Sequence, residues 1–296
     1  MKKRSISSIF VFFVLNLAYC QTLNLEMDSE TSEPFLLGKI DKSGLTAPNY
    51  NLWFSTAYDA YEPNNTIIDK LRPLLKDYQI TVFMGTWCGD SKQEVPRFYK
   101  ILEACDFPKT QLTTVAVSRK PYMYKQSPNH EEAGLNIHRV PTFIFYKDRK
   151  EVNRIVEHPV EDLESDMLQI VSDNAYQTNY MIVNEIHSIL KLDGINGLKA
   201  SAEKLTKSYA EKVTSMHELN TYGRVLYHNN HIDEAIEVFR LNTRLFPEIP
   251  NTYMSLANTL GISGRQSESI EVLENALQRF PKNEDLIENL DVIKSN

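Results

Sequence analysis

Hydrophobic residues follow two different spacings along the chain, and the change between them divides it. Between residues 65 and 173, short apolar runs alternate with amphipathic stretches. Runs such as 79–85 (QITVFMG) and 112–118 (LTTVAVS) are rich in β-branched and aromatic residues, which is typical of buried strands. From about residue 174 onward the apolar residues recur at helical spacing. The pattern predicts an α/β part followed by an all-α part.

The α/β part is predicted to follow the order helix, strand, helix, strand, strand, strand, helix. This order is typical of a mixed sheet flanked by helices. The many aromatic residues of 35–63 precede it, and we expect them to pack an N-terminal extension onto the sheet. The predicted elements are, in chain order, 65–76, 79–85, 91–105, 112–118, 140–147, 150–157 and 160–172.

The last third of the chain contains an internal repeat. Two stretches align on their closing prolines, Pro247 and Pro281, which gives a period of 34 residues. Small residues, Gly223 and Ala257, occupy equivalent positions on the first helix of each unit, where they allow a second helix to approach. A 34-residue period of paired helices resembles the tetratricopeptide repeat over residues 216–282. The resemblance implies a stack of helix pairs with a concave surface for a peptide or helix.

The first twenty residues have the features of an export signal. Lys2, Lys3 and Arg4 precede an apolar stretch, 6–18, that is too short to span a bilayer comfortably. Small residues allow cleavage before Gln21, which would place the protein in the periplasm. Two alternatives stay open: the segment is kept as a membrane anchor, or Cys20 carries a lipid.

Charge and composition exclude several functions. The formal net charge is −7, and since the first twenty residues carry three cations and no acid, the remainder carries −10. An acidic body without a basic block argues against nucleic acid or anionic lipid as a partner. The sequence has no zinc signature, phosphate-binding glycine loop or Ser-His-Asp arrangement, so we expect neither metal nor cofactor. Three cysteines are too few for a disulfide framework.

Cys88 is the main candidate for chemistry. It stands between a predicted strand and a predicted helix, where unpaired backbone N–H groups and the helix dipole favour the thiolate. Asp90 opposes the thiolate, whereas Lys92 acts the other way. Cys105 lies 17 residues further along, roughly 25 Å away on the same helix, and is predicted to be a buried hydrophobic residue.

Residues 65–173 resemble the thioredoxin fold, especially its exported bacterial members. The matching segments are TWCGDSK at 86–92, with Pro96 eight residues after the cysteine, and GLNIHRVPTFIFYKD at 134–148. The resemblance implies a nucleophilic thiol, a loop that shapes its surroundings, and a cis-proline beside a groove for an extended peptide. The residues that it assigns to these roles are Cys88, then Trp87, Gly89, Asp90 and Ser91, then Val140 and Pro141.

Two residues depart from the family pattern. Ser91 stands where two-cysteine members carry their second thiol, and Val82 stands where many carry a buried acid. Ser91 cannot attack a mixed disulfide, although it can donate a hydrogen bond to a thiolate. Three hypotheses follow for Cys88. It exchanges disulfides as a monothiol that a low-molecular-weight thiol or partner resolves; its groove only binds peptides or proteins; or it is a sensor oxidised to sulfenic acid.

The sequence thus predicts an exported protein that acts on, or binds, a protein or peptide partner. Membrane contact is expected only if the N-terminal segment is kept. The predicted division of the chain is a signal peptide (1–20), an extension (21–64), a thioredoxin-like domain (65–175), connecting helices (176–211) and tetratricopeptide-like repeats with a capping helix (212–296).

Overall fold

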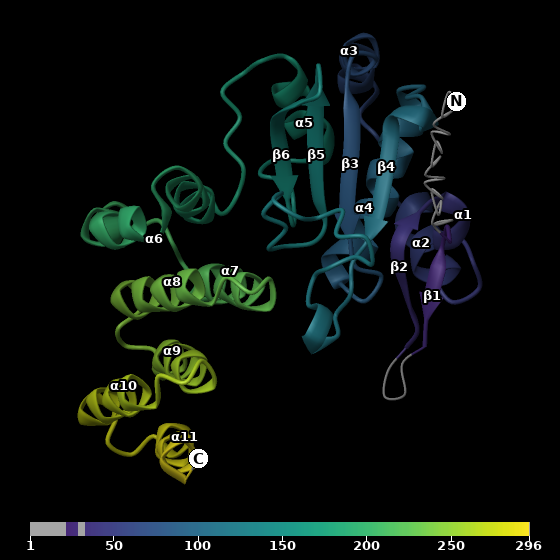
Figure 1. Ribbon diagram of the computed structural model, residues 1–296. Helices are drawn as coiled ribbons and strands as arrows, with labels where there is room; N and C mark the ends of the chain where they lie inside the picture. Colours follow the sequence, from purple (N-terminus) through teal and green to yellow (C-terminus); the bar gives the residue numbers. More distant parts are fainter. Residues whose placement is uncertain (1–21, 29–32, 296) are drawn as a thin grey trace, which may run out of the picture.

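The computed structural model describes residues 22–28 and 33–295, so the predicted export signal and Cys20 lie outside the described residues. A six-stranded mixed sheet with flanking helices comes first, and a region built from helices follows it (Figure 1). This confirms the predicted order of an α/β part before an all-α part. Among the helices described, none is long and apolar enough to cross a membrane.

The sheet has the strand order β1-β2-β4-β3-β5-β6. β3 runs parallel to β4, and the other neighbouring pairs are antiparallel. A tight turn joins β5 to β6, with left-handed φ values of 52° at Asp148 and 63° at Arg149, as a two-residue hairpin requires. The strands are β1 (Leu25–Met27), β2 (Phe35–Ile40), β3 (Gln79–Met84), β4 (Leu112–Ala116), β5 (Thr142–Lys147) and β6 (Lys150–Val156).

Five α-helices belong to this part of the chain. The side chains of Asn64 and Asp162 accept hydrogen bonds from backbone N–H groups at the starts of α3 and α5, which explains where those helices begin. All predicted helices and strands are found within a few residues of their predicted bounds. The helices are α1 (Lys42–Leu45), α2 (Asn51–Asp59), α3 (Asn65–Leu75), α4 (Gly89–Ala104) and α5 (Leu163–Val171).

The N-terminal extension does more than pack onto the sheet, which corrects the sequence-based expectation. Its strands β1 and β2 join the sheet, and β2 pairs with β4, with Gly38 opposite Ala116. Five of the six β2 residues are buried. A strand that is buried on both faces shows no alternation of polar and apolar residues, so the pattern did not reveal it.

The two faces of the sheet are covered differently. Ile80, Val82 and Met84 point into the core that α2, α3, α4 and α5 complete. Phe83, on the opposite face, packs against residues of the irregular segment 117–141, which connects β4 to β5. Within that segment the structure has a single short 3-10 turn, η2 (Pro121–Met123). An irregular segment therefore covers the face on which the sulfur of Cys88 lies.

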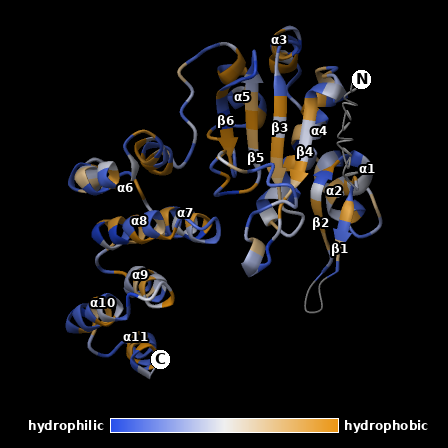
Figure 2. Ribbon diagram, in the orientation of Figure 1, coloured by the Kyte–Doolittle hydropathy of each residue, from blue (hydrophilic) through white to orange (hydrophobic). Residues whose placement is uncertain are grey.

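The helical part is a consecutive stack in which each helix packs on the next (Figure 1). Gly194, at φ 64° and ψ −164°, interrupts α6 with a non-helical residue. Hydrophilic and hydrophobic residues alternate along each helix of the stack (Figure 2), and most of the buried residues of these helices are apolar. The helices are α6 (Met181–Tyr209), α7 (His217–His228), α8 (Ile232–Leu245), α9 (Pro250–Ile262), α10 (Gln266–Arg279) and α11 (Glu284–Ser295).

Small residues bring the helices of each pair together. A Cβ atom added to Gly223 of α7 would lie 2.6 Å from the Phe239 ring of α8, so only glycine fits there. The equivalent residues of the next pair, Ala257 and Leu273, are fully buried in one cluster. The buried polar residue at the contact between α9 and α10 is satisfied, since Ser269 Oγ donates to the Ala257 carbonyl at 2.7 Å.

Candidate functional site

Cys88 lies where the central strand β3 turns into α4. Its backbone N–H donates to the Gly85 carbonyl at 2.9 Å, and its own carbonyl accepts from Lys92 N at 3.0 Å, which starts the helix. The residue is the N-cap of α4, with extended φ and ψ of −93° and 130°. The side chain is half-buried. The strand, turn and helix thus place the thiol where the sequence predicts it.

The Cys88 sulfur meets a carbonyl from a distant part of the chain. The Val140–Pro141 peptide bond is cis. Cys88 Sγ lies 3.1 Å from the Val140 carbonyl oxygen, to which the thiol donates a hydrogen bond. Val140 is buried and packs in the same apolar cluster as the cysteine. The structure therefore brings together the two separate segments that the sequence analysis singled out.

The surroundings of Cys88 favour the neutral thiol. Burial raises the pKa of the thiol, and the Asp90 carboxylate, whose Oδ2 lies 3.8 Å from Sγ, adds to the increase. Hydrogen bonds from Ser91 and from the backbone N–H of Asp90 act in the opposite direction, but the pKa stays raised. Lys92, expected to support the thiolate, instead faces Glu33, with Nζ 3.7 Å from a carboxylate oxygen. The prediction that these surroundings favour the thiolate is therefore wrong, because burial of the thiol outweighs the hydrogen bonds that would lower its pKa.

The remaining loop residues are of two kinds: two form hydrogen bonds with the backbone, and two are exposed to solvent. Trp87 is half-buried, and its indole N–H donates to the Val117 carbonyl at 2.9 Å. Ser91 is fully buried and its hydroxyl accepts from the Gly85 N–H at 3.2 Å, so it also holds the turn in place. Gly89 and Asp90 are exposed to solvent. A ligand that approaches the sulfur therefore meets the exposed edge formed by these two residues.

Cys105 lies at the opposite end of α4 from Cys88. It is the C-cap of the helix and is buried, with 2% of its surface exposed. Burial raises the pKa of its thiol to about 11. Both cysteines are free thiols. Since the helix separates them by roughly 25 Å, Cys105 cannot reach a disulfide formed on Cys88 in the folded protein.

The sequence analysis missed a buried lysine in the segment beside Cys88. Lys125 is 6% exposed, and its ammonium donates to the His138 carbonyl. Burial, with a further contribution from the charge of Arg139, lowers the pKa of Lys125 to about 7. His138 is buried as well, and burial holds the pKa of its imidazole well below the usual range. A lysine in a polar loop gives no sequence signal of burial.

Helix α7 of the helical part packs against this same segment. Arg139 donates to the His217 carbonyl at 2.9 Å, at the start of α7. Gln126 donates to the His228 carbonyl at 2.8 Å, at its end. Between these contacts, the Arg224 guanidinium lies 4.7 Å from the centre of the Tyr124 ring. The helical part thus lies beside the cysteine rather than apart from it.

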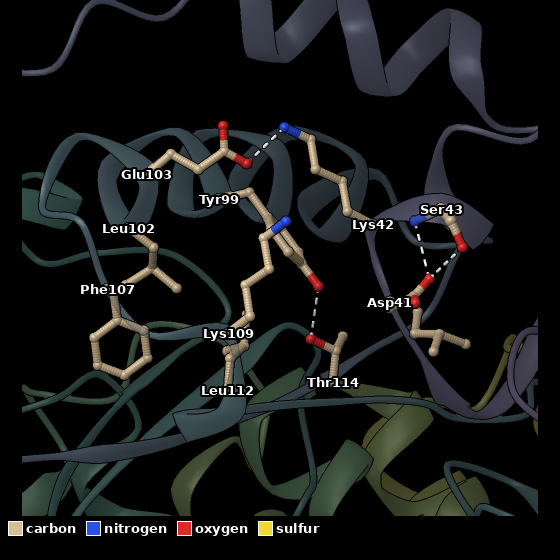
Figure 3. Close-up of a pocket in the computed structure, with 11 residues that line it drawn as sticks. Asp41, Lys42, Ser43, Tyr99, Leu102, Glu103, Phe107, Lys109, Leu112 and Thr114 are labelled. Atoms are coloured by element: carbon tan, nitrogen blue, oxygen red, sulfur yellow. Dashed lines mark hydrogen bonds and ion pairs between the residues drawn. The ribbon is translucent and has the colours of Figure 1, made fainter.

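A separate pocket of about 260 Å³ lies at the far end of α4 (Figure 3). Its polar groups face one another: Lys42 Nζ lies 2.6 Å from Glu103 Oε1, and the Tyr99 hydroxyl lies 2.9 Å from Thr114 Oγ1. This pocket is remote from Cys88, because Glu103 belongs to the last turn of the helix that Cys88 begins. Throughout the described residues, no group of three His, Cys, Asp or Glu side chains could hold a metal ion.

The fold and site define a class in general terms: a mixed α/β sheet that presents one half-buried cysteine at a helix N-terminus, continued by a stack of helices. Comparison with known proteins adds no family, since no family model and no curated protein matches the chain.

Proposed function

We propose that this chain is an exported thioredoxin-like protein that exchanges disulfides with a partner protein through the single thiol of Cys88. The observation that carries the proposal is the placement of the Cys88 sulfur at the start of α4, 3.1 Å from the carbonyl that precedes Pro141. Cys88 is half-buried rather than fully buried, and we expect a partner disulfide to reach its sulfur.

The proposed reaction has two steps. The Cys88 thiolate attacks one sulfur of the partner's disulfide; that S–S bond breaks, a new one forms to Cys88, and the other partner sulfur leaves as a thiolate that takes up a proton. An external low-molecular-weight thiol, as its thiolate, then attacks the partner's sulfur of the mixed disulfide and releases Cys88. The second thiol has to be external because Ser91 carries none and Cys105 lies at the other end of α4.

The raised pKa of Cys88 has consequences for both steps. Fewer thiolates are present at neutral pH, which slows attack. A sulfur with a raised pKa is also a poor leaving group. When the external thiol attacks the partner's sulfur, Cys88 therefore leaves slowly, and the mixed disulfide is long-lived. The site is therefore suited to capture of a partner more than to rapid turnover.

The helical part is proposed to be a tetratricopeptide-like stack that recruits the partner. Support comes from the 34-residue period of the sequence and from the glycine contact between α7 and α8. The starts of α8 and α10, at Ile232 and Gln266, differ by the same 34 residues. Paired helices with this period stack into a concave surface that suits an extended peptide.

The second candidate function is binding without exchange. The observation that favours it is the raised pKa of Cys88, together with the hydrogen bond that ties its thiol to Val140. In this case the groove beside Pro141 would hold a peptide while the thiol stays protonated.

The test is mixed-disulfide formation by the folded, reduced protein with 4,4′-dithiodipyridine, followed by digestion and mass spectrometry. We expect an adduct on Cys88 that dithiothreitol or glutathione removes, and no adduct on Cys105 until urea is added. A Cys88→Ser variant is the control for the site. If Cys88 forms no adduct while the protein stays folded, exchange is excluded and binding alone is left.

A further inference from the structure

Two cations at the segment 117–141, which covers the Cys88 face of the sheet, have no carboxylate partner among the described residues. Arg224 is exposed and Lys120 half-exposed, and neither forms an ion pair with any residue that the structure describes. Each lies against a tyrosine of the same segment: Arg224 is 4.7 Å from the Tyr124 ring centre, and Lys120 Nζ is 6.0 Å from that of Tyr122. Aromatic rings hold such cations in place without neutralising them.

Each cation is connected to the surroundings of the cysteine through the segment 117–141. For Lys120 the connection is the chain itself: the indole N–H of Trp87, which precedes Cys88, donates a hydrogen bond to the Val117 carbonyl, and Lys120 follows Val117 by three residues. For Arg224 the connection is Tyr124: burial raises the pKa of this tyrosine, the charges of Arg224 and Arg139 act in the opposite direction, and a Cys88 thiolate adds to the increase. These four groups are therefore electrostatic neighbours.

The aromatic surface between the cations is open. Tyr122 is 76% exposed, which is unusual for a large aromatic side chain and leaves its ring available to a ligand. Together, Lys120, Tyr122, Tyr124 and Arg224 are here called the cationic wall.

The cationic wall contrasts with the chain as a whole, whose formal net charge is −7. Nearby carboxylates are mostly engaged: Glu157 lies 2.8 Å from Arg139, and Glu33 lies 3.7 Å from Lys92. Asp90, on the α4 side of the sulfur, and Glu218 of α7, near Arg139, form no ion pair with the described residues. A locally positive surface on an acidic protein concentrates anionic ligands there.

We propose that the cationic wall selects an acidic peptide segment around the partner's cysteine and directs it to Cys88. This inference rests on the proposed function, since it concerns the same sulfur. Tyr122 and Tyr124 would contact the peptide, while Lys120 and Arg224 would pair with its carboxylates. Helix α7 would then contribute to specificity at the reacting sulfur as well as to recruitment.

The first experiment compares two methanethiosulfonate reagents, sulfonatoethyl (anionic) and trimethylammonioethyl (cationic), with modification of Cys88 followed by mass spectrometry of digests. In each case the Cys88 thiolate forms a disulfide with the reagent and methanesulfinate leaves. The measured quantity is the anionic-to-cationic rate ratio, divided by the same ratio for 2-mercaptoethanol. We expect a Lys120→Gln/Arg224→Gln variant to lower this quotient about three- to tenfold at low salt, and high salt to abolish the difference.

The matched control is Lys70→Gln/Lys204→Gln, which removes the same net charge from exposed positions on α3 and α6 and should leave the quotient unchanged. Equal quotients in the wild type and in both double variants would refute the proposal that the cationic wall selects anionic ligands. The proposed exchange function would not be affected. Failure of both reagents to modify Cys88 would instead overturn the exchange function itself.

The second experiment tests whether the ligand selected by the cationic wall is an acidic peptide. Two peptides of equal length carry an activated cysteine disulfide with thionitrobenzoate, one flanked by Glu and the other by Lys. We expect the Glu peptide to react faster with Cys88, and the Lys120→Gln/Arg224→Gln variant to lose the preference. A charge preference for the small reagents without one for the peptides would refute an acidic peptide as the ligand.

Discussion

Replacement of Lys125 by methionine tests the electrostatics of the segment beside Cys88. The side chain is 6% exposed and its ammonium donates to the His138 carbonyl. Methionine has a similar length and no charge, so it fills the space without the cost of burying an ammonium group.

The magnitude follows from the pKa of Lys125, which burial lowers from 10.5 to about 7. Between these two values the unfolded chain binds a proton that the folded protein does not, so stability rises with pH across this interval. Below about pH 7 both states are protonated and the full penalty, about 5 kcal/mol, opposes folding. From about pH 7 to about pH 9.5, linkage returns about 3 kcal/mol to the wild-type protein.

The assay is urea unfolding of both proteins over this pH range, followed by tryptophan fluorescence. Trp53 and Trp87 both lie in the α/β part, so the signal reports on the part that contains Lys125. We expect the unfolding free energy of wild type minus that of Lys125→Met to rise by about 3 kcal/mol from about pH 7 to about pH 9.5. Taking the difference cancels groups that titrate in both proteins.

Lys70→Met, an exposed substitution on α3, controls for the loss of one positive charge. A difference between wild type and Lys125→Met that changes by less than about 1 kcal/mol over the same range would refute the reasoning. The Lys125 ammonium would then be solvated, and the packing of α7 against this segment would be looser than described.

Other substitutions test the helix packing and the site. Gly223→Ala should destabilise the helical part by about 1–3 kcal/mol. Gly261→Ala, whose Cβ makes only ordinary contacts at 3.6 Å and beyond, should stabilise it by up to about 1 kcal/mol. Circular dichroism during thermal unfolding distinguishes the two effects, and equal effects would contradict the close contact between α7 and α8. Asp90→Asn should lower the midpoint of iodoacetamide alkylation of Cys88 against pH, since the carboxylate raises the pKa of the thiol; an unchanged midpoint would show that burial acts alone. Trp87→Phe should cost about 1 kcal/mol in urea unfolding through loss of the indole hydrogen bond, and no loss would mean that water replaces that bond.

Local patterns were sufficient to predict most of the α/β part. The strands β3 and β5 are short apolar runs, and α3 begins at a predicted polar start. β2 was missed because nearly all its residues are buried, so it reads as an apolar stretch without alternation. Its place in the sheet depends on pairing with β4, more than seventy residues later, which no local pattern encodes.

The candidate site could be predicted only in part. The approach of Cys88 to Val140 was expected from a resemblance between two separate segments, and the geometry agrees with it. The increase in the pKa of the Cys88 thiol was not expected from the sequence, because burial of the sulfur depends on how closely Val140 and the Trp87 loop pack around it. The cations of Lys125 and Arg224 were missed because their surroundings form only when α7 packs against the α/β part.

The order of segments along the chain also determines when, during synthesis, the Cys88 thiol gains the carbonyl that accepts its hydrogen bond. Pro141, whose neighbouring carbonyl accepts the Cys88 hydrogen bond, is made roughly fifty residues after the cysteine, which at about 5–20 residues per second takes about 3–10 seconds. Over this interval the sulfur lacks its acceptor, and Cys105 is made within the first third of it. Helix formation takes on the order of a microsecond, so once the nascent chain folds α4, the two sulfurs are at opposite ends of a rod. From the moment it forms, the helix thus keeps the Cys105 thiol away from the Cys88 thiol.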